Sequence, residues 1–270
     1  MLFVLCGNLA VFAQSDTKIK GDRNVTIKQT YIDDFNALVI NGDFPVEVIY
    51  NSRPSVEIEA DDNLHDVIDF QVIDGVLTFT ETMKITSKKK LQIRINYGDN
   101  LSHIEANADS EIRSLTSMEL NNVTLKTDND SRVYLNINAT SFKYEGFGKS
   151  KIRLNLNADT TDIILNDNTK FDGLIVSKAS KFNLYQRADA LVEGSTDNLS
   201  IITDNSSKFN GTKFNAKSAK VNALINSDIY TNISDSLALE ISGNSEVYLY
   251  GSPKIDLMTF TDTAKLQKKE

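Results

Sequence analysis

The stretch SRVYLNI at residues 131–137 returns nineteen residues later as SKIRLNL at residues 150–156, and this pair decides the fold. In both copies a serine is followed by residues that alternate between polar and aliphatic side chains. Alternation with a period of two is typical of a β-strand that has one buried and one exposed face. Because the same register recurs at a fixed spacing, the sequence predicts a repeat architecture built from short strands.

The serine that opens each copy belongs to a series of small polar residues, which we call the anchors. They lie at Ser110, Ser131, Ser150, Thr169, Ser207, Ser227, Ser245 and Thr263. Their spacings are 21, 19, 19, 38, 20, 18 and 18 residues, and since 38 is twice 19 we expect one degenerate repeat near residues 188–190. Hairpins at the intervening Asn-, Asp- and Ser-rich turns would give a sandwich. The constant place of the anchor favours coils of a parallel β-solenoid instead, stacked about 4.8 Å apart.

Side chains after each anchor are expected to alternate between the coil interior and the outer surface. The expected interior positions are all apolar: Ile112, Val133, Leu135, Ile152, Leu154, Phe171, Phe209, Ile229, Val247 and Leu249. The expected outward positions are charged or aromatic: Glu111, Arg113, Arg132, Tyr134, Lys151, Arg153, Lys170, Lys208, Asp228, Tyr230, Glu246, Tyr248 and Tyr250. This division is what an all-β solenoid with coils of about nineteen residues requires.

The apolar run at residues 1–14 ends in Val11-Phe12-Ala13, which predicts a secretory signal peptide over residues 1–13, although no positive charge precedes the run. A buried N-terminal element and a lipid anchor at Cys6 are the alternatives. Removal of the peptide would leave a mature chain without cysteine, since Cys6 is the only one. The run is too short for a membrane span, and no later one is longer. We therefore expect an exported protein, located in the periplasm or at the cell surface.

Residues 14–270 are expected to form one domain, in which residues 22–100 are a β-rich N-terminal capping section and residues 101–264 are the coils. In the capping section the alternating pattern predicts strands over residues 24–30, 37–40, 45–49, 55–60, 70–73, 76–80 and 91–97. Asp74-Gly75 is a hairpin signal, and Asp62 or Asn63 is expected to cap one helical turn. The charged tail at residues 265–270 is expected to blunt the far end of the solenoid.

The first section also carries a family resemblance. The stretches FNALVINGDFPVEV at residues 35–48, VEIEADDNL at residues 56–64 and DGVL at residues 74–77 resemble the auto-transporter adhesin head (GIN) domains common in Bacteroidetes. The resemblance covers nearly the whole mature chain. It implies a right-handed parallel β-helix that is exported, has no recognised catalytic residues and acts as an adhesin.

The coil corners depart from the pattern of that family. Its Gly-Ser-Gly corners are mostly replaced here, for example by residues 108–110 (ADS), 129–131 (NDS) and 205–207 (NSS). Asn and Asp adopt left-handed backbone more readily than other residues with a side chain. We therefore expect the corners to survive the change.

Composition and spacing exclude several kinds of chemistry. The 29 basic and 37 acidic residues give a net charge of -8, which argues against a nucleic-acid partner for the molecule as a whole. The two histidines, His65 and His103, have no metal-ligand spacing, and the acidic turns match no calcium-binding loop. We therefore expect no metal site, no cofactor and no catalytic residue. The oligomeric state stays open.

The outward residues of successive coils give the best candidate for a binding site. The candidate ligand-binding residues are Arg132, Tyr134, Lys151, Arg153, Lys170, Lys208, Tyr230 and Tyr248. Cations can pair with the acidic groups of a glycan and tyrosine rings can stack on sugars, so the leading hypothesis is a non-catalytic binding module for a glycan or another cell-surface component.

Two other readings of the same residues stay open. The cations and tyrosines could simply solubilise an exposed sheet in a structural envelope protein. Alternatively, the protein could be a polysaccharide lyase or hydrolase built on a β-helix. The enzyme hypothesis is disfavoured because hydrolysis needs two nearby carboxyl groups, and paired acids do not appear at the outward positions along the middle of the rod.

Overall fold

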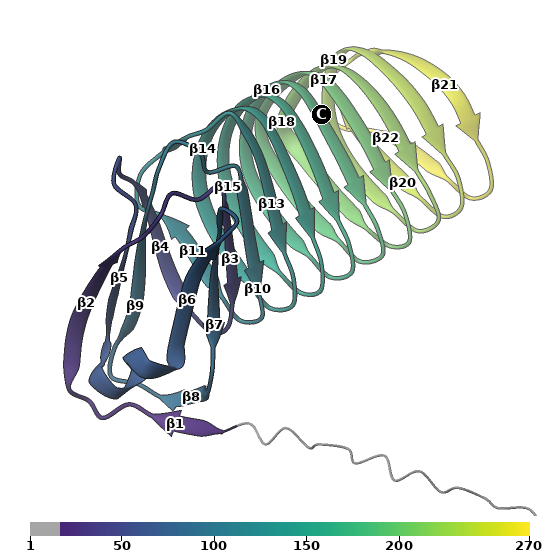
Figure 1. Ribbon diagram of the computed structural model, residues 1–270. Helices are drawn as coiled ribbons and strands as arrows, with labels where there is room; N and C mark the ends of the chain where they lie inside the picture. The colour runs from purple at the N-terminus through teal and green to yellow at the C-terminus, as the bar shows by residue number, and fades with distance from the viewer. Residues whose placement is uncertain (1–16) are drawn as a thin grey trace, which may run out of the picture.

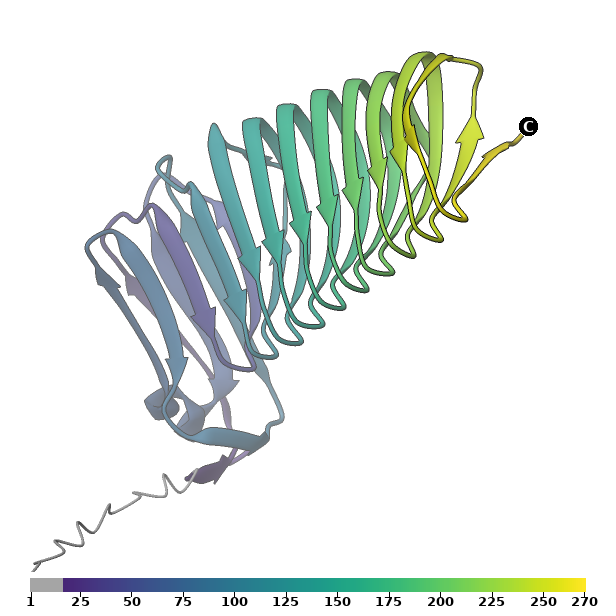
Figure 2. The same ribbon diagram turned by 90° about the vertical axis from the view of Figure 1, so that its right-hand side faces the viewer.

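A computed structural model describes residues 17–270, so the expected signal peptide over residues 1–13 lies outside the described residues. The described chain is a rod of β-strands whose coils stack from the N-terminal to the C-terminal end (Figure 1). It is a β-solenoid of about nine turns with coils of about nineteen residues, and the parallel pairing of successive coils confirms the expected fold (Figure 2).

Six long strands form the regular part of the rod, and each of them supplies one coil. They are β14 (Arg132–Gly146), β15 (Lys151–Leu165), β16 (Lys170–Leu184), β17 (Asp189–Thr203), β18 (Lys208–Ala223) and β19 (Asp228–Ile241). Each strand bends in its middle, where the alternation of buried and exposed side chains changes phase. In β14 the buried set runs through Ile137, and after the bend it resumes at Phe142. The two segments expected in each coil are therefore joined into one strand around a corner.

The expected facing of the side chains is confirmed. All ten predicted interior residues are buried, and all the predicted outward residues are exposed or half-buried. Aromatic rings from neighbouring coils meet inside the rod, where Phe182 contacts Phe171, Phe209 and Phe214 at centroid separations of 6.1, 5.1 and 6.2 Å. The apolar interior is therefore one continuous core along the axis.

The turn before each coil contains a residue with left-handed backbone, two positions before the anchor. These residues are Ala108, Asn129, Gly148, Asp167, Gln186, Asn205, Ile225, Gly243 and Asp262. Seven of these nine corners thus keep their geometry without a glycine, as expected. The β-branched Ile225 is strained there, because its Cβ crowds the backbone at a φ of 59°.

The anchors are buried, with one correction at the C-terminal end. The serines and threonine from Ser110 to Ser245 are at most 1% exposed, and Ala188 takes the place of the degenerate repeat as expected. The predicted anchor Thr263 is exposed, and Ala264 occupies the position instead. Glu246 pairs with Lys265, so the last spacing is 19 residues rather than 18. The prediction of Thr263 as the last anchor was wrong because the residue that occupies this corner, Ala264, is not polar.

The N-terminal section contains strands that sequence analysis placed correctly and one pair that it missed. The elements are β1 (Lys18–Lys20), β2 (Val25–Tyr31), β3 (Ala37–Asn41), β4 (Pro45–Tyr50), β5 (Ser55–Asp61), the 3-10 helix η1 (Asp62–Val67), β6 (Ile68–Ile73), β7 (Val76–Glu81), β8 (Lys84–Ser87) and β9 (Leu91–Tyr97). The parallel pair of β1 with β8 was not predicted. It lies at the N-terminal end, away from the regular coils (Figure 1).

Coils also occur within this section, and they are stacked out of sequence order. The strands that follow are β10 (His103–Asn107), β11 (Glu111–Ser114), β12 (Met118–Glu119) and β13 (Asn122–Thr127). β10 pairs in parallel with both β13 and β3, and β3 pairs with β7 on its other side. On the second sheet β11 pairs with β4, and β4 with β9. The repeat therefore extends into residues 22–100, and antiparallel β5, β2 and β6 close its end.

The helical turn expected near Asp62 is present, but its cap differs. The N-cap residue is Asp61, and its side chain makes no capping hydrogen bond. Its buried carboxylate instead accepts backbone N–H bonds from Arg23, Lys89 and Lys90 at 3.2, 3.0 and 3.0 Å. Burial opposes ionisation of this group, but the three N–H donors and the charge of Arg23 outweigh it and lower the pKa of Asp61.

The C-terminal end is only partly covered. β22 (Lys265–Lys268) pairs with β20 (Glu246–Tyr250), while β21 (Lys254–Phe260) pairs with β19. The charged tail therefore blunts one of the two sheets, as expected, but not the other. On β21 the aliphatic side chains of Ile255 and Leu257 are 40% and 51% exposed, since no other coil formed by residues 17–270 packs on them.

The facing of the strands can be tested with two neighbouring positions on β14. Leu135 is buried, so we expect Leu135→Asp to lower the free energy of unfolding by more than about 3 kcal/mol, because it places a charge in the apolar core. Tyr134 faces outward, so Tyr134→Asp should cost less than about 1 kcal/mol. Circular-dichroism melts measure both variants, and equal damage from the two would show that the assignment is wrong.

The buried carboxylate of Asp61 predicts a pH dependence of stability. Folding lowers the pKa of Asp61 below its ordinary value of 3.8, so its contribution is present above that value and is lost as the pH falls through the folded pKa. Asp61→Asn should lower the melting temperature at pH 7 and show a smaller further loss between pH 4 and pH 2 than the wild type. Melting curves of wild type and variant that fall in parallel over this range would contradict the prediction.

Candidate functional site

Five of the eight predicted binding residues lie together on the outer face of β14, β15 and β16. The parallel register aligns Arg132, Lys151 and Lys170 on successive strands, a set that we call the cation row. Two residues further along, Tyr134 is aligned with Arg153. Because neighbouring strands lie about 4.8 Å apart, these side chains form a compact group.

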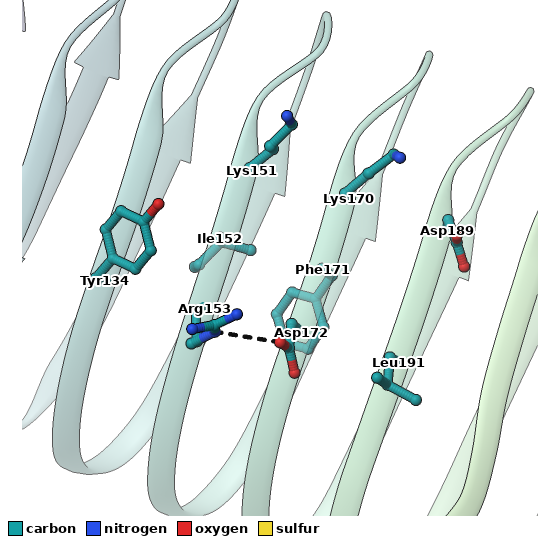
Figure 3. Close-up of a pocket in the computed structure, with 9 residues that line it drawn as sticks. All are labelled: Tyr134, Lys151, Ile152, Arg153, Lys170, Phe171, Asp172, Asp189 and Leu191. Carbon is teal, nitrogen blue, oxygen red and sulfur yellow. Dashed lines mark hydrogen bonds and ion pairs between the residues drawn. The ribbon is translucent and has the colours of Figure 1, made fainter.

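All of the group except Arg132 line a shallow depression of about 270 Å³, whose lining residues are drawn in Figure 3. Ile152 and Phe171, whose side chains are buried, also line it. Its rim is formed by Tyr134, Lys151, Arg153, Lys170, Asp172, Asp189 and Leu191. The depression therefore combines cationic, aromatic and aliphatic groups on rigid β-structure.

The charges in this group are not equally free. Arg153 is paired with Asp172, with 3.2 Å between Nε and Oδ2 (Figure 3). Across residues 17–270 the side chains of Arg132, Lys151 and Lys170 make no ion pair and no hydrogen bond. Like charges on adjacent strands destabilise a sheet, so the cation row carries an unfavourable energy that a bound anion would relieve.

One face of the Tyr134 ring is already occupied. The guanidinium of Arg113 lies 3.9 Å from the ring centroid, and Arg113 is also paired with Glu111 at 2.6 Å. The neighbour of Tyr134 on the next coil is Arg153, which shares the depression with it. A ligand in the depression would therefore contact the part of the Tyr134 ring that faces Arg153, because Arg113 covers the other face.

The other three predicted residues, Lys208, Tyr230 and Tyr248, lie apart from this group. Asp189 stands between Lys170 and Lys208 in the ladder and interrupts the row of positive charge. The rings of Tyr230 and Tyr248 stack on each other at 4.3 Å. The ammonium of Lys208 lies 5.4 Å from the first ring centroid and that of Lys269 lies 5.1 Å from the second, so both outer faces of the stack carry a cation. A sugar could reach only the ring edges.

A pair of carboxylates lies next to the tyrosine stack, outside the middle of the rod that sequence analysis considered. Asp228 and Glu246 are aligned on neighbouring strands. Glu246 is paired with Lys265 at 2.7 Å and also accepts a hydrogen bond from the Tyr248 hydroxyl. These two contacts lower the pKa of Glu246, whereas burial and the nearby Glu246 raise that of Asp228. The more acidic carboxylate is thus engaged by the protein itself.

Three exposed aliphatic residues near the depression were not among the residues predicted from the sequence. Leu174, Val176 and Leu191 are 51%, 50% and 41% exposed. We call them the aliphatic patch. Leu174 and Val176 stand five and seven residues after the anchor Thr169, where the alternation points side chains outward. An apolar residue in an outward phase was therefore the signal that could have found them.

Neither histidine lies in this group. His65 contacts the Thr26 hydroxyl at 3.0 Å, and burial lowers its pKa. His103 contacts Glu105 at 3.5 Å. Over residues 17–270 there is no group of three His, Cys, Asp or Glu side chains placed to hold a metal ion. The same range has no helix with the length and apolar character needed to cross a membrane.

The sequence matches a known family over most of its length. Residues 34–253 correspond to the family described as "Putative auto-transporter adhesin, head GIN domain". This match confirms the resemblance inferred from residues 35–77. Comparison with curated proteins gives no match.

Solved structures share the fold at low sequence identity. A putative adhesin from Parabacteroides merdae has 17% identity and a TM-score of 0.67, covering 94% of this chain and 100% of its own. A putative adhesin from Parabacteroides distasonis has 18% identity and a TM-score of 0.65, covering 93% and 99%. A putative lipid binding protein from the same species has 16% identity and a TM-score of 0.63, covering 93% and 97%. At these identities the similarity establishes a common solenoid.

The contact between Tyr248 and Glu246 predicts an unusual titration. This hydrogen bond, together with burial and the neighbouring Tyr230, raises the pKa of the Tyr248 hydroxyl above its ordinary value of 10.0. At pH 10, where an ordinary tyrosine is half ionised, Tyr248→Phe should therefore remove less tyrosinate absorbance at 295 nm than a half-ionised tyrosine contributes. A decrease equal to that contribution would show that the hydroxyl titrates freely and that Glu246 is not engaged.

Proposed function

Because the chain belongs to the family of putative auto-transporter adhesin head GIN domains, we propose that it is an exported, non-catalytic binding module that recognises an acidic glycan of the cell envelope. The cation row is the observation that carries this proposal. Three positive side chains that have no ion-pair or hydrogen-bond partner among residues 17–270 stand side by side on a rigid sheet. The carboxylate or sulfate groups of a glycan would supply the missing negative charge.

The stacking of coils makes recognition along the rod multivalent. Each coil presents its cation at the same position, so a chain with regularly placed acidic groups could contact Arg132, Lys151 and Lys170 in turn. Each exposed ion pair contributes little by itself, but contacts on one rigid surface add without a large further loss of freedom. A sugar bound there would contact the side of the Tyr134 ring that faces Arg153.

The net charge of -8 limits the region in which the protein can attract an acidic ligand. Outside the cation row the protein repels an acidic ligand, so attraction is local and is screened within about 8 Å at physiological salt. Binding of an acidic glycan is therefore expected to weaken as salt is raised.

The arrangement of the carboxylates supports a role without catalysis. Retaining and inverting glycosidases need one carboxyl group as a general acid and a second that is free to act as nucleophile or base. In the pair formed by Asp228 and Glu246 the second group is held by Lys265 and Tyr248. Asp189 and Lys208 also separate this pair from the cation row.

Charge reversal tests the proposal. Binding of the chain to an array of acidic and neutral glycans is compared with that of the variant Arg132→Glu/Lys151→Glu/Lys170→Glu. We expect the wild type to bind acidic glycans, and the variant to lose at least tenfold in apparent affinity. Circular dichroism confirms that the variant is folded, since all three side chains are exposed.

The matched control carries the same change of net charge at the N-terminal end. Lys18→Glu/Lys20→Glu/Lys84→Glu alters exposed residues on β1 and β8 and should bind as the wild type does. If the two triple variants lose binding equally, the effect is one of net charge and the cation row is not the site. If the wild type binds no acidic glycan, the proposed function is wrong.

A further inference from the structure

The cation row and the aliphatic patch meet on β16, which carries Lys170, Leu174 and Val176, and Leu191 lies on the adjacent β17. We propose that the two together bind a single anionic amphiphile, with its charged group at Lys151 and Lys170 and its hydrocarbon chain along Leu191, Leu174 and Val176. The proposal rests on the proposed function and narrows the ligand to the acidic, lipid-linked components of a cell envelope. Lys151 and Lys170, two of the three cations that would hold an acidic sugar, would hold the head group of such a lipid.

The first support is that the neighbouring coils carry polar side chains where Leu174 and Val176 stand. At the position of Leu174 the neighbouring coils carry Asn155 and Glu193. At the position of Val176 they carry Asn157 and Ser195. Because adjacent coils fold with polar residues at these two positions, the coil does not need aliphatic side chains there in order to fold. About half of each of the two side chains is accessible to solvent, so covering them with hydrocarbon would be favourable.

The second support is the path that one strand provides. On β16 the outward residues read Lys170, Asp172, Leu174 and Val176 in order. At about 3.3 Å per residue, the path from Lys170 to Val176 is about 20 Å long, which matches an extended hydrocarbon chain with its head group. Asp172 lies on the path, but Arg153 neutralises it. No unpaired acid therefore stands between the cationic and the aliphatic ends.

The third support is the shape of the surface. The depression beside the cation row has a volume of about 270 Å³. A second depression of about 220 Å³ is lined by Leu174 and Val176 together with Asn136, Asn155 and neighbouring residues. Both depressions involve residues of β15 and β16, so they follow each other along the direction of the strands. The charge of the first and the aliphatic wall of the second fit the two halves of an amphiphile.

The experiment uses alkyl phosphates of increasing length as probes. Isothermal titration calorimetry measures the binding of inorganic phosphate and of octyl, decyl and dodecyl phosphate, each below its micelle concentration, to the full chain. We expect the alkyl phosphates to bind about twofold more tightly for each added methylene, since a chain on an open face buries about half of its surface. Inorganic phosphate should bind weakly, because it lacks the apolar contact.

Two variants assign the two halves of the ligand. Leu174→Ser/Val176→Ser should abolish the dependence on chain length and leave the binding of acidic glycans unchanged. Lys151→Glu/Lys170→Glu should weaken every alkyl phosphate by at least tenfold. The matched control is Ile255→Ser/Leu257→Ser on β21, which makes a similar change at two exposed aliphatic residues of another strand and should behave as the wild type.

Several results would overturn the proposal. Affinity that does not depend on chain length, or a dependence that survives Leu174→Ser/Val176→Ser, would show that the patch takes no hydrocarbon chain. Self-association in sedimentation velocity that this variant abolishes would instead make the patch an interface between copies of the chain. In each of these cases, binding of acidic glycans by the wild type would leave the proposed function unaffected. If the wild type binds no acidic glycan, both the proposed function and the amphiphile proposal are wrong.

Discussion

The structure depends on the in-register stacking of parallel coils. Each central strand is hydrogen-bonded to the coil before it and to the coil after it, so a residue lies directly beside its equivalents nineteen residues away. A slip by one residue would turn every buried side chain outward, from Val133 and Ile152 to Phe171. The buried anchors and the left-handed corners fix the starting point of each coil against such a slip. Every ladder of equal or alternating side chains on the surface follows from this constraint.

Two rows of charged side chains on successive coils show different consequences of this in-register stacking. At the bend of the coils, acidic and basic residues alternate, with Lys178 paired to Asp159 and Lys217 to Asp197 at 2.7 Å each. The alternation reinforces the register, because displacement of one coil along its strand would separate these pairs. The cation row at the other edge of the same strands repeats one sign and has no such structural benefit. The contrast between the two ladders is a physical reason to look for a ligand at the second.

Much of the fold could be predicted from local patterns, because a solenoid converts sequence spacing directly into spatial neighbours. The facing of residues such as Leu135 and Lys151 required only the period of two and the position of the anchor. The coils of the N-terminal section could not be found in this way, since Ala37 pairs with His103 across 66 residues and the chain returns past them through β7 and β9.

Asp61 was also missed as a structural residue, because its N–H donors come from segments far apart in the sequence. For the candidate site, outward facing could be predicted, and so could the place of Asp189 after Lys170, because the degenerate repeat was expected at residues 188–190. The covering of the tyrosine rings by lysines depends on side-chain geometry and could not.

The open side of the last described coil has a consequence for how the rod loses its structure. Within residues 17–270, β21 is hydrogen-bonded on one side only, and its aliphatic residues are half-exposed. In a linear array of coils the end unit has one interface instead of two, so it opens at a smaller free-energy cost than a central coil. The rod is therefore expected to unravel from this end, whereas the opposite end is closed by antiparallel strands. The cation row, on β14 to β16, lies several coils away from β21, so the proposed binding surface stays intact while the terminal coil fluctuates.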